Sequence, residues 1–497
     1  MYDLFIQGLI NVFTLNNVFF ILVGTFLGII FGALPGISST LSVAILIPFT
    51  FKMDPATGLC MLGAIYCASV YGGSISAILI NVPGTSSSVA TSWDGYELTK
   101  KGQAGRALGI STLASTYGGL FSALCLLTIA PTLAKTSLRF GPPERFFLAL
   151  FGLIIIITLS SESLLKGLIS AFFGLAIAVT GIDAISGSFR FTWGQYCLFD
   201  GIPFLPALIG LVSIPQAAAI IETTQTSIQV TKNMVKDRII PNWSDLKSTF
   251  LTFNRSAIIG TIIGIIPGAG GDPASYLGYS EAKRNSKHPE EFGKGAINGV
   301  AGPESANNAV TGGCLVPMLT LGIPGNAVSA VFLGGLLIHG LVPGPELFIK
   351  HGVVTYTLMV SLFLSNIVMC IFGLLGAKMF IKVVKIPTNI LSPCIVVLSI
   401  IGSYAMRNNF FDVGIMFLFG IFGYIMKKGR FSYTPIILAL ILGPLAEKEL
   451  KRSLLIFGGN ILPVFTRPLC VILIIICVLL FVSSLLRTYK LFKESKK

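Results

Sequence analysis

Two apolar runs of this sequence end abruptly in a Pro-Gly pair that is followed by small residues. The first ends in GALPGISST, residues 32–40, and the second in GIIPGAGGD, residues 264–272. Proline cannot continue an α-helix and glycine adopts backbone conformations that other residues avoid, so each motif predicts a helix break. In hydrocarbon, non-helical backbone survives only where it is buried in protein or lines a water-filled cavity. The two motifs therefore predict broken helices around an internal cavity.

The composition indicates that the chain lies in a membrane. Charged residues make up 11% of the sequence, against about 25% in soluble domains. Apolar runs near the ~20 residues that a spanning helix needs recur from one end to the other. We predict an all-α, polytopic integral membrane protein, surrounded by the lipid bilayer, with about a dozen transmembrane or re-entrant helices.

The basic residues mark loops rather than a nucleic-acid surface. The net charge of +14 comes from Lys and Arg clusters between apolar runs, which is the pattern of cytoplasmic loops. The loop at 100–106 and the stretch at 223–255 are therefore predicted to be cytoplasmic, residues 1–17 and 131–145 are predicted to face outside, and no nucleic acid is expected as a partner. The nine cysteines lack CxxC spacing, so no metal site is expected.

The sequence divides into two halves that share one plan. We predict a first transmembrane repeat at 1–222, a cytoplasmic connector at 223–255, and a second repeat with C-terminal helices at 256–497. Each half contains a second break, NVPGTSSS at 81–88 and LGIPGN at 321–326. If the first half begins outside and the second inside, the repeats are inverted, as in many secondary transporters, whose substrate site lies between the broken helices.

The residues around the four breaks form the candidate substrate site. The breaks contain no Lys or Arg, but free N–H groups and the helix dipole at a helix start favour an anion. The alternative is that the breaks are ordinary kinks, because Gly and Pro are frequent in membrane helices. The candidate substrate-binding residues are Pro35, Gly36, Ser38, Ser39, Thr40, Asn81, Pro83, Gly84, Thr85, Ser86, Pro267, Gly268, Gly270, Pro324, Gly325 and Asn326.

Four polar residues at apparent membrane depth are candidates for coupling transport to a cation. An unpaired charge in the bilayer is expensive, so ionisable residues there are functional candidates. These candidates are Asp272, Glu304, Asn307 and Asn308. The alternative for Asp272 is a helix cap with Pro273 as the first helical residue. The alternative for the two asparagines is interhelical hydrogen bonding.

Motifs of several enzyme classes are missing from the sequence. Neither GxxxxGK[ST] nor HExxH occurs. Gly270-Gly271-Asp272 and Ser186-Gly187 only approach the GxGD and GxSG motifs of intramembrane proteases. We therefore expect no enzyme and no catalytic residue. A passive carboxylate channel and, more distantly, an intramembrane hydrolase are the alternatives to a transporter.

Five ordered stretches resemble the large membrane subunit of the tripartite tricarboxylate transporters, and the resemblance covers nearly the whole chain. They are GALPGISSTLSVAILIPFTF, YGGSISAILINVPGTSSSVATSWDGY, GIIPGAGGDPASYLGY, GKGAINGVAGPESANNAVTGGCLVPMLTLGIPGN and GLVPGPELF. The resemblance implies a secondary transporter of the bacterial inner membrane, in which the four breaks form the translocation site. The expected substrate is a citrate-like di- or tricarboxylate, taken up with Na⁺ or H⁺ and without any other cofactor. The expected partners are a small membrane subunit and a periplasmic solute-binding protein, and an elevator-like movement is the expected mechanism.

Overall fold

The computed structural model describes residues 2–159, 163–183, 185–222, 237–383, 388–460 and 462–494. Within these residues the chain forms nineteen α-helices, four short 3₁₀ helices and a single two-stranded hairpin. The predicted all-α fold is confirmed. Eight of the helices are long and apolar enough to cross a membrane, and they are α2, α4, α6, α9, α15, α16, α17 and α19.

The helices and strands divide between the two halves of the chain. In the first half they are α1 (Tyr2–Val12), α2 (Leu15–Ala33), α3 (Ser39–Thr50), α4 (Pro55–Ile80), η1 (Ser86–Ser88), α5 (Val89–Lys100), α6 (Ala104–Ser137), α7 (Pro142–Leu159), α8 (Leu164–Ala178), β1 (Gly181–Ile182), β2 (Phe189–Arg190), η2 (Tyr196–Leu198) and α9 (Phe204–Glu222). In the second half they are α10 (Trp243–Ile265), α11 (Gly271–Arg284), η3 (Pro289–Glu291), α12 (Ile297–Leu321), α13 (Ala327–Ile338), α14 (Pro345–Lys350), α15 (Gly352–Val383), α16 (Thr388–Arg407), α17 (Phe410–Lys428), α18 (Thr434–Ile456), η4 (Leu462–Thr466) and α19 (Pro468–Glu494).

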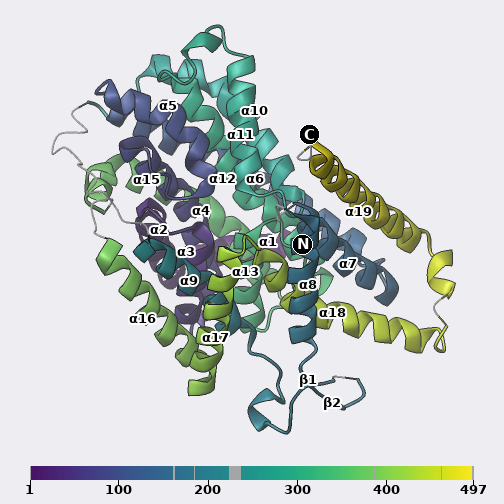
Figure 1. Cartoon of the computed structure of the whole chain (residues 1–497). Coiled ribbons are helices and arrows are strands. Elements are labelled where there is room, and N and C mark those ends of the chain that lie inside the picture. The colour runs from purple at the N-terminus through teal and green to yellow at the C-terminus, as the bar shows by residue number, and fades with distance from the viewer. Residues whose placement is uncertain are drawn as a thin grey trace.

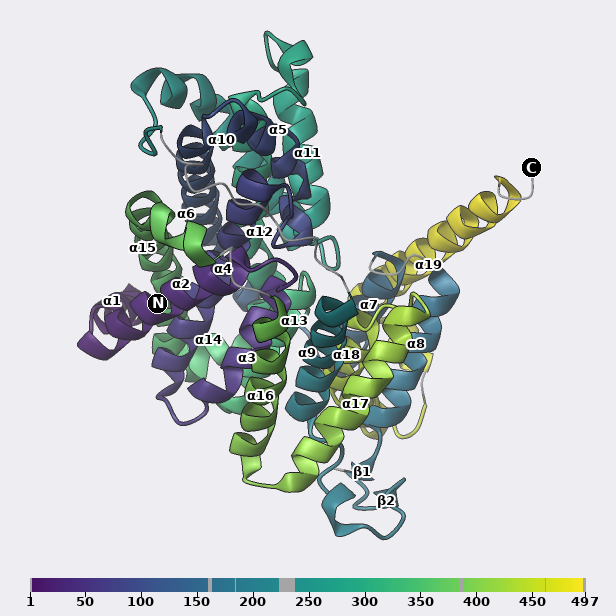
Figure 2. The same cartoon turned by 60° about the vertical axis from the view of Figure 1, so that its left-hand side comes forward.

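Helix α12 lies at the centre of the larger group of helices. It packs against α4, α5, α6, α10, α11 and α13 (Figure 1). Helices α7, α8, α18 and α19 pack against one another on one side of this group (Figure 2). The β1–β2 hairpin lies at the end of the molecule opposite to α5 and the upper part of α10 in both views.

The two halves repeat the same local geometry at their breaks. Helices α2 and α10 both end in an extended residue, after which Gly36 and Gly268 take positive φ values of +85° and +81°. Helices α4 and α12 both end in a left-handed residue, Asn81 and Gly322. This correspondence supports a repeated plan. The inverted orientation of the two repeats stays a prediction.

Several boundaries differ from those that the apolar runs indicate. Helix α10 begins at Trp243, inside the stretch predicted as a polar connector, because polar residues continue the helix beyond the apolar run. The first part of that connector, 223–236, lies outside the described residues. The Gly- and Asn-rich segment at 298–313, which precedes the last break, forms the interior of α12. Its small residues allow close packing against α6 and α10.

Candidate substrate-binding cavity

The four breaks meet around one cavity of about 410 Å³. Its lining comes from the starts of α3, of α11, of α13 and of η1, which leads into α5, together with residues of α4, α12 and α18. The described lining residues include no Lys, Arg or His, and Asp272 is their single carboxylate. The lining residues are Ser38, Ser39, Thr40, Tyr66, Val70, Thr85, Ser86, Ser87, Gly268, Ala269, Gly270, Gly271, Asp272, Pro273, Asn307, Val310, Asn326, Ala327, Val328 and Thr434.

The first break turns the chain from α2 into α3. The carbonyl oxygen of Gly36 accepts a hydrogen bond from Gln216 of α9, which fixes the turn to a distant helix. Ser38 is the N-cap of α3, and its Oγ accepts from the backbone N–H of Leu41 at 3.2 Å. The start of α3 therefore faces the cavity with a capped first turn.

The second break carries α4 into η1 and α5. Gly84 has no room for a side chain, because a Cβ atom there would come within 2.1 Å of the carbonyl oxygen of Gly32. Thr85 is the N-cap of η1, and its Oγ1 lies 2.7 Å from the Oγ of Ser88. This close packing places Thr85 and Ser86 at the cavity wall.

The third break joins α10 to α11. The N–H of Gly268 donates to the carbonyl oxygen of Gly325 at 2.8 Å, which ties the third break to the fourth. The N-cap of α11 is Gly270, and Asp272 lies in the first turn of that helix. The alternative of Asp272 as the N-cap is therefore wrong. Its Oδ1 instead accepts from the hydroxyl of Ser86 at 2.9 Å, linking the two halves across the cavity.

The fourth break starts α13 with a complete capping box. The side chain of Asn326 accepts from the N–H of Ser329 at 2.8 Å, and the Ser329 hydroxyl lies 2.9 Å from the N–H of Asn326. The amide nitrogen of Asn326 also donates to the Tyr66 hydroxyl of α4 at 2.9 Å. Tyr66 thus orients the helix start that faces the cavity.

The structure places the predicted site residues in two groups. Those that line the cavity are Ser38, Ser39, Thr40, Thr85, Ser86, Gly268, Gly270, Asp272, Asn307 and Asn326. The others, which do not line it, are Pro35, Gly36, Asn81, Pro83, Gly84, Pro267, Pro324, Gly325, Glu304 and Asn308. The prolines and glycines of this second group belong to the turns that aim the helix starts inward.

The two asparagines of α12 differ in role. Asn307 lines the cavity, and among the described residues its buried amide nitrogen has no hydrogen-bond partner. Asn308 donates to the carbonyl oxygen of Ser115 on α6 at 2.9 Å, so the interhelical hydrogen bond expected as its alternative is present.

Tyr66, Val70 and Thr434 are lining residues that the sequence did not indicate. Tyr66 and Val70 lie inside the long apolar run of α4, and Thr434 begins α18, far along the chain. Ser87, by contrast, belongs to the quoted motif NVPGTSSS, and that motif was the signal available for it.

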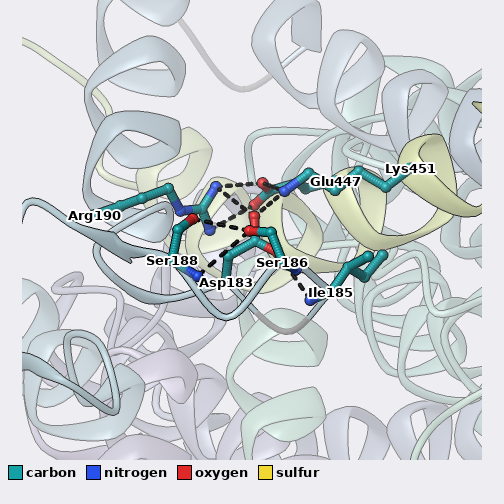
Figure 3. A network of polar contacts seen from close by, with 7 residues as sticks. All are labelled: Asp183, Ile185, Ser186, Ser188, Arg190, Glu447 and Lys451. Atoms are coloured by element: carbon teal, nitrogen blue, oxygen red, sulfur yellow. Dashed lines mark hydrogen bonds and ion pairs between the residues drawn. The ribbon is translucent and has the colours of Figure 1, made fainter.

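A second cavity, of about 300 Å³, lies beside the β1–β2 hairpin and has a different character. There Asp183 and Glu447 form ion pairs with Lys451 and Arg190 (Figure 3). The ion pair with Lys451 holds the pKa of the Asp183 carboxyl well below its ordinary value, helped by N–H donors of Ile185 and Ser186. This cluster fastens the hairpin to α18.

The fold and the cavity define a multi-pass membrane protein whose broken helices surround a central cavity. The chain belongs to the tripartite tricarboxylate transporter TctA family, whose family model matches residues 18–438. Its resemblance to the large subunit of these transporters is thereby confirmed.

Two relatives come from Agrobacterium vitis. The chain is 38% identical over 473 residues to the uncharacterized 52.8 kDa protein of the TAR-I ttuC′ 3′ region, covering 95% of this chain and 93% of the relative. It is 37% identical over 232 residues to the uncharacterized protein of the TAR-II ttuC′ 3′ region, covering 46% of this chain and 96% of that relative. No solved structure matches the chain.

Proposed function

We propose that this chain is the permease subunit of a binding-protein-dependent secondary transporter that imports a di- or tricarboxylate such as citrate. The observation that carries the proposal is the meeting of four helix starts in one cavity. Its volume of about 410 Å³ lies within the range of small-ligand sites. Membership of the TctA family supports the same class of substrate.

The helix starts offer an anion site that needs no basic side chain. The first N–H groups of a helix lack partners within the helix, and the helix dipole makes that end positive. One helix start contributes roughly 0.3–1 kcal/mol to binding a negative charge, so a multiply charged anion needs several. In this cavity α3, α11 and α13 supply three, and η1 with α5 supplies a fourth.

A co-transported cation, Na⁺ or H⁺, completes the proposal. Asp272 lies on the same cavity as the helix starts, so its carboxylate and an anionic substrate repel each other. A cation between them relieves this repulsion and lowers the cost of moving the substrate through a medium of low dielectric. Substrate and cation are then expected to bind cooperatively. The candidate cation residues are Asp272, Glu304, Asn307 and Asn308.

The proposed setting is the bacterial inner membrane, with a small membrane subunit and a periplasmic solute-binding protein as partners. The tripartite character of the family supports both partners. The binding protein captures the carboxylate and delivers it to the outward-facing cavity. A passive channel, the alternative, needs neither delivery nor a cation.

The test is uptake of labelled citrate and smaller dicarboxylates into vesicles that hold this chain and the small subunit. The proposal predicts accumulation above equilibrium that requires both the binding protein and a Na⁺ or H⁺ gradient. Labelled acetate, a monocarboxylate, serves as the control and is expected not to accumulate. Equilibration of citrate without binding protein or gradient contradicts the proposal in favour of a channel, and no flux of any carboxylate contradicts the substrate class.

A further inference from the structure

One buried carboxylate differs from all the others in the described chain. The buried carboxylates there are Asp94, Glu144, Asp183, Asp245, Glu304, Asp412 and Glu449. Five of them pair with Lys or Arg: Glu144 with Arg467, Asp183 with Lys451, Asp245 with Arg106, Asp412 with Arg407 and Glu449 with Arg452. Asp94 accepts three backbone N–H groups, from residues 293, 295 and 296. Glu304 has neither kind of partner among the described residues.

Within the described residues, the hydrogen bonds of the Glu304 carboxyl come from hydroxyl groups. Its Oε1 accepts from Thr91 of α5 at 2.5 Å, and its Oε2 accepts from Ser115 of α6 at 2.8 Å. Its side chain is fully buried at 0% exposure. An ionised carboxylate without a counter-charge is costly in such a place, which favours the protonated acid. A hydroxyl can donate to the ionised form and accept from the protonated form, so this cage accommodates both.

The same cage favours a proton over a metal ion. A bound metal ion lies between its ligand oxygens and holds them apart. Here the Thr91 and Ser115 oxygens are in direct hydrogen-bond contact with the carboxylate, and nearby Ser74 and Ser111 are 2.7 Å apart from each other. The oxygens thus satisfy one another without an ion.

Glu304 lies directly behind the wall of the substrate cavity, close to lining residues of two elements, α12 and η1. On α12 it precedes the lining residue Asn307 by three positions, which is one helical turn. On the other side its partner Thr91 follows the lining residue Ser87 by four positions, where η1 continues into α5. A change of charge at Glu304 therefore acts on both cavity walls.

We propose that Glu304 is the site that binds and releases the coupling proton of this transporter. The inference rests on the proposed function and selects H⁺ as the cation. Glu304 takes up one proton with each substrate in the outward-facing state, and the acid returns to carboxylate when the proton leaves on the cytoplasmic side.

Infrared difference spectroscopy of the purified full-length protein tests the protonation without any substrate. The wild-type spectrum minus that of Glu304→Gln is expected to show the carbonyl stretch of a protonated carboxylic acid at neutral pH, shifting in D₂O. Glu144→Gln, which removes a buried carboxylate paired with Arg467, is the control and should show only carboxylate bands. The proposal is overturned if the difference spectrum between the wild type and Glu304→Gln lacks the carbonyl stretch of a protonated acid.

Transport then tests the coupling. In vesicles without Na⁺, Glu304→Gln is expected to lose at least about tenfold in pH-gradient-driven accumulation while retaining exchange of labelled for unlabelled carboxylate. Undiminished accumulation by Glu304→Gln overturns the inference and leaves the proposed function intact. Absence of carboxylate flux in the wild type overturns the proposed function, and the infrared band then decides whether Glu304 holds a proton.

A milder variant covers the case in which Glu304→Gln does not fold. Ser115→Ala removes one hydroxyl donor from the Glu304 carboxyl. It is expected to shift the pH midpoint of uptake by about one pH unit, which is a tenfold change in proton concentration. Ser122→Ala removes another buried hydroxyl of α6, which donates to Gly119 of its own helix and accepts from the N–H of Gly312 on α12. It does not contact the carboxyl of Glu304, so this variant should leave the midpoint unchanged. Equal midpoints for both variants and the wild type contradict the proposal.

Discussion

Single residues decide whether the helix starts point into the cavity. Ser38 and Asn326 cap their helices, and because capping depends on neighbours within one turn of the chain, this part of the site is of the kind that a sequence can indicate. Tyr66 and Thr434 were not predicted, because only tertiary packing brings α4 and α18 to the cavity. The hydroxyl cage of Glu304 was likewise hidden, since Thr91 and Ser115 come from two other helices.

At Gly325, replacement by alanine is expected to reduce uptake roughly tenfold or more while the protein still inserts. A Cβ atom there would lie 2.5 Å from the Cβ of Cys314 and 2.6 Å from the carbonyl oxygen of Gly264, so the fourth break must shift. Gly414→Ala is the matched control, because nothing lies within 4 Å of its added Cβ. Vesicle uptake at equal membrane content measures the effect. Normal uptake by Gly325→Ala would show that the breaks are only kinks.

At the scale of elements, the sequence predicted broken helices better than it predicted their limits. The Pro-Gly pairs end α2 and α10 at nearly the predicted positions, since proline and glycine act locally. The start of α10 at Trp243 lies inside the predicted connector, and for the continuous course of α12 through Pro303 no prediction was made. Both depend on packing against neighbouring helices, which overrides local preference.

The start of α13 should matter for substrate and not only for stability. Asn326→Ala removes its N-cap and is expected to destabilise the protein by about 1 kcal/mol. It should also raise the KM for uptake roughly two- to fivefold, because the helix start is no longer held toward the cavity. The matched control is Asn409→Ala. Asn409 is the N-cap of α17, where its side chain accepts from the N–H of Phe411, and it does not line the cavity. A KM raised equally by both variants would contradict this role.

The attachment of the hairpin is expected to depend on pH. Because the pKa of Asp183 is lowered in the folded protein, its ion pairs stabilise the hairpin above the unfolded-state pKa of roughly 3.9. This contribution is lost as the pH falls through the lower, folded-state pKa. Cleavage of the hairpin by an acid-active protease should therefore accelerate below about pH 4.

The control for the pH experiment is Asp183→Asn. This variant lacks the carboxylate, so its hairpin should already be cleaved faster by a neutral protease at neutral pH, and acid should add little. Equal protection of the wild-type hairpin at acid and neutral pH would show that the cluster in Figure 3 does not hold it.

At the scale of the whole molecule, the charge pattern predicts which end faces the cytoplasm. The basic loop after α5 and the β1–β2 hairpin lie at opposite ends in Figures 1 and 2. If the loop at 100–106 is cytoplasmic, the hairpin and the exposed Cys197 in the same connection face outside. The cavity then lies between the two ends, as alternating access requires.

Thiol labelling of intact bacterial cells measures this orientation. Cys197 is expected to react with a membrane-impermeant maleimide without permeabilisation, and Cys197→Ser should abolish that labelling. In the Cys197→Ser background, Lys100→Cys should react only after permeabilisation. Labelling of both positions from the same side would contradict the predicted topology.

The position of the transport site is tested most directly by an electron cryomicroscopy structure of the protein with a carboxylate that it accumulates. Density for the anion is expected between the starts of α3, α11 and α13, in contact with Ser38, Ser86 or Asn326. The cavity beside the hairpin, which has three basic and three acidic side chains in its lining, is the competing site. Density for the carboxylate there, with the central cavity empty, would contradict the claim that four helix starts form the transport site.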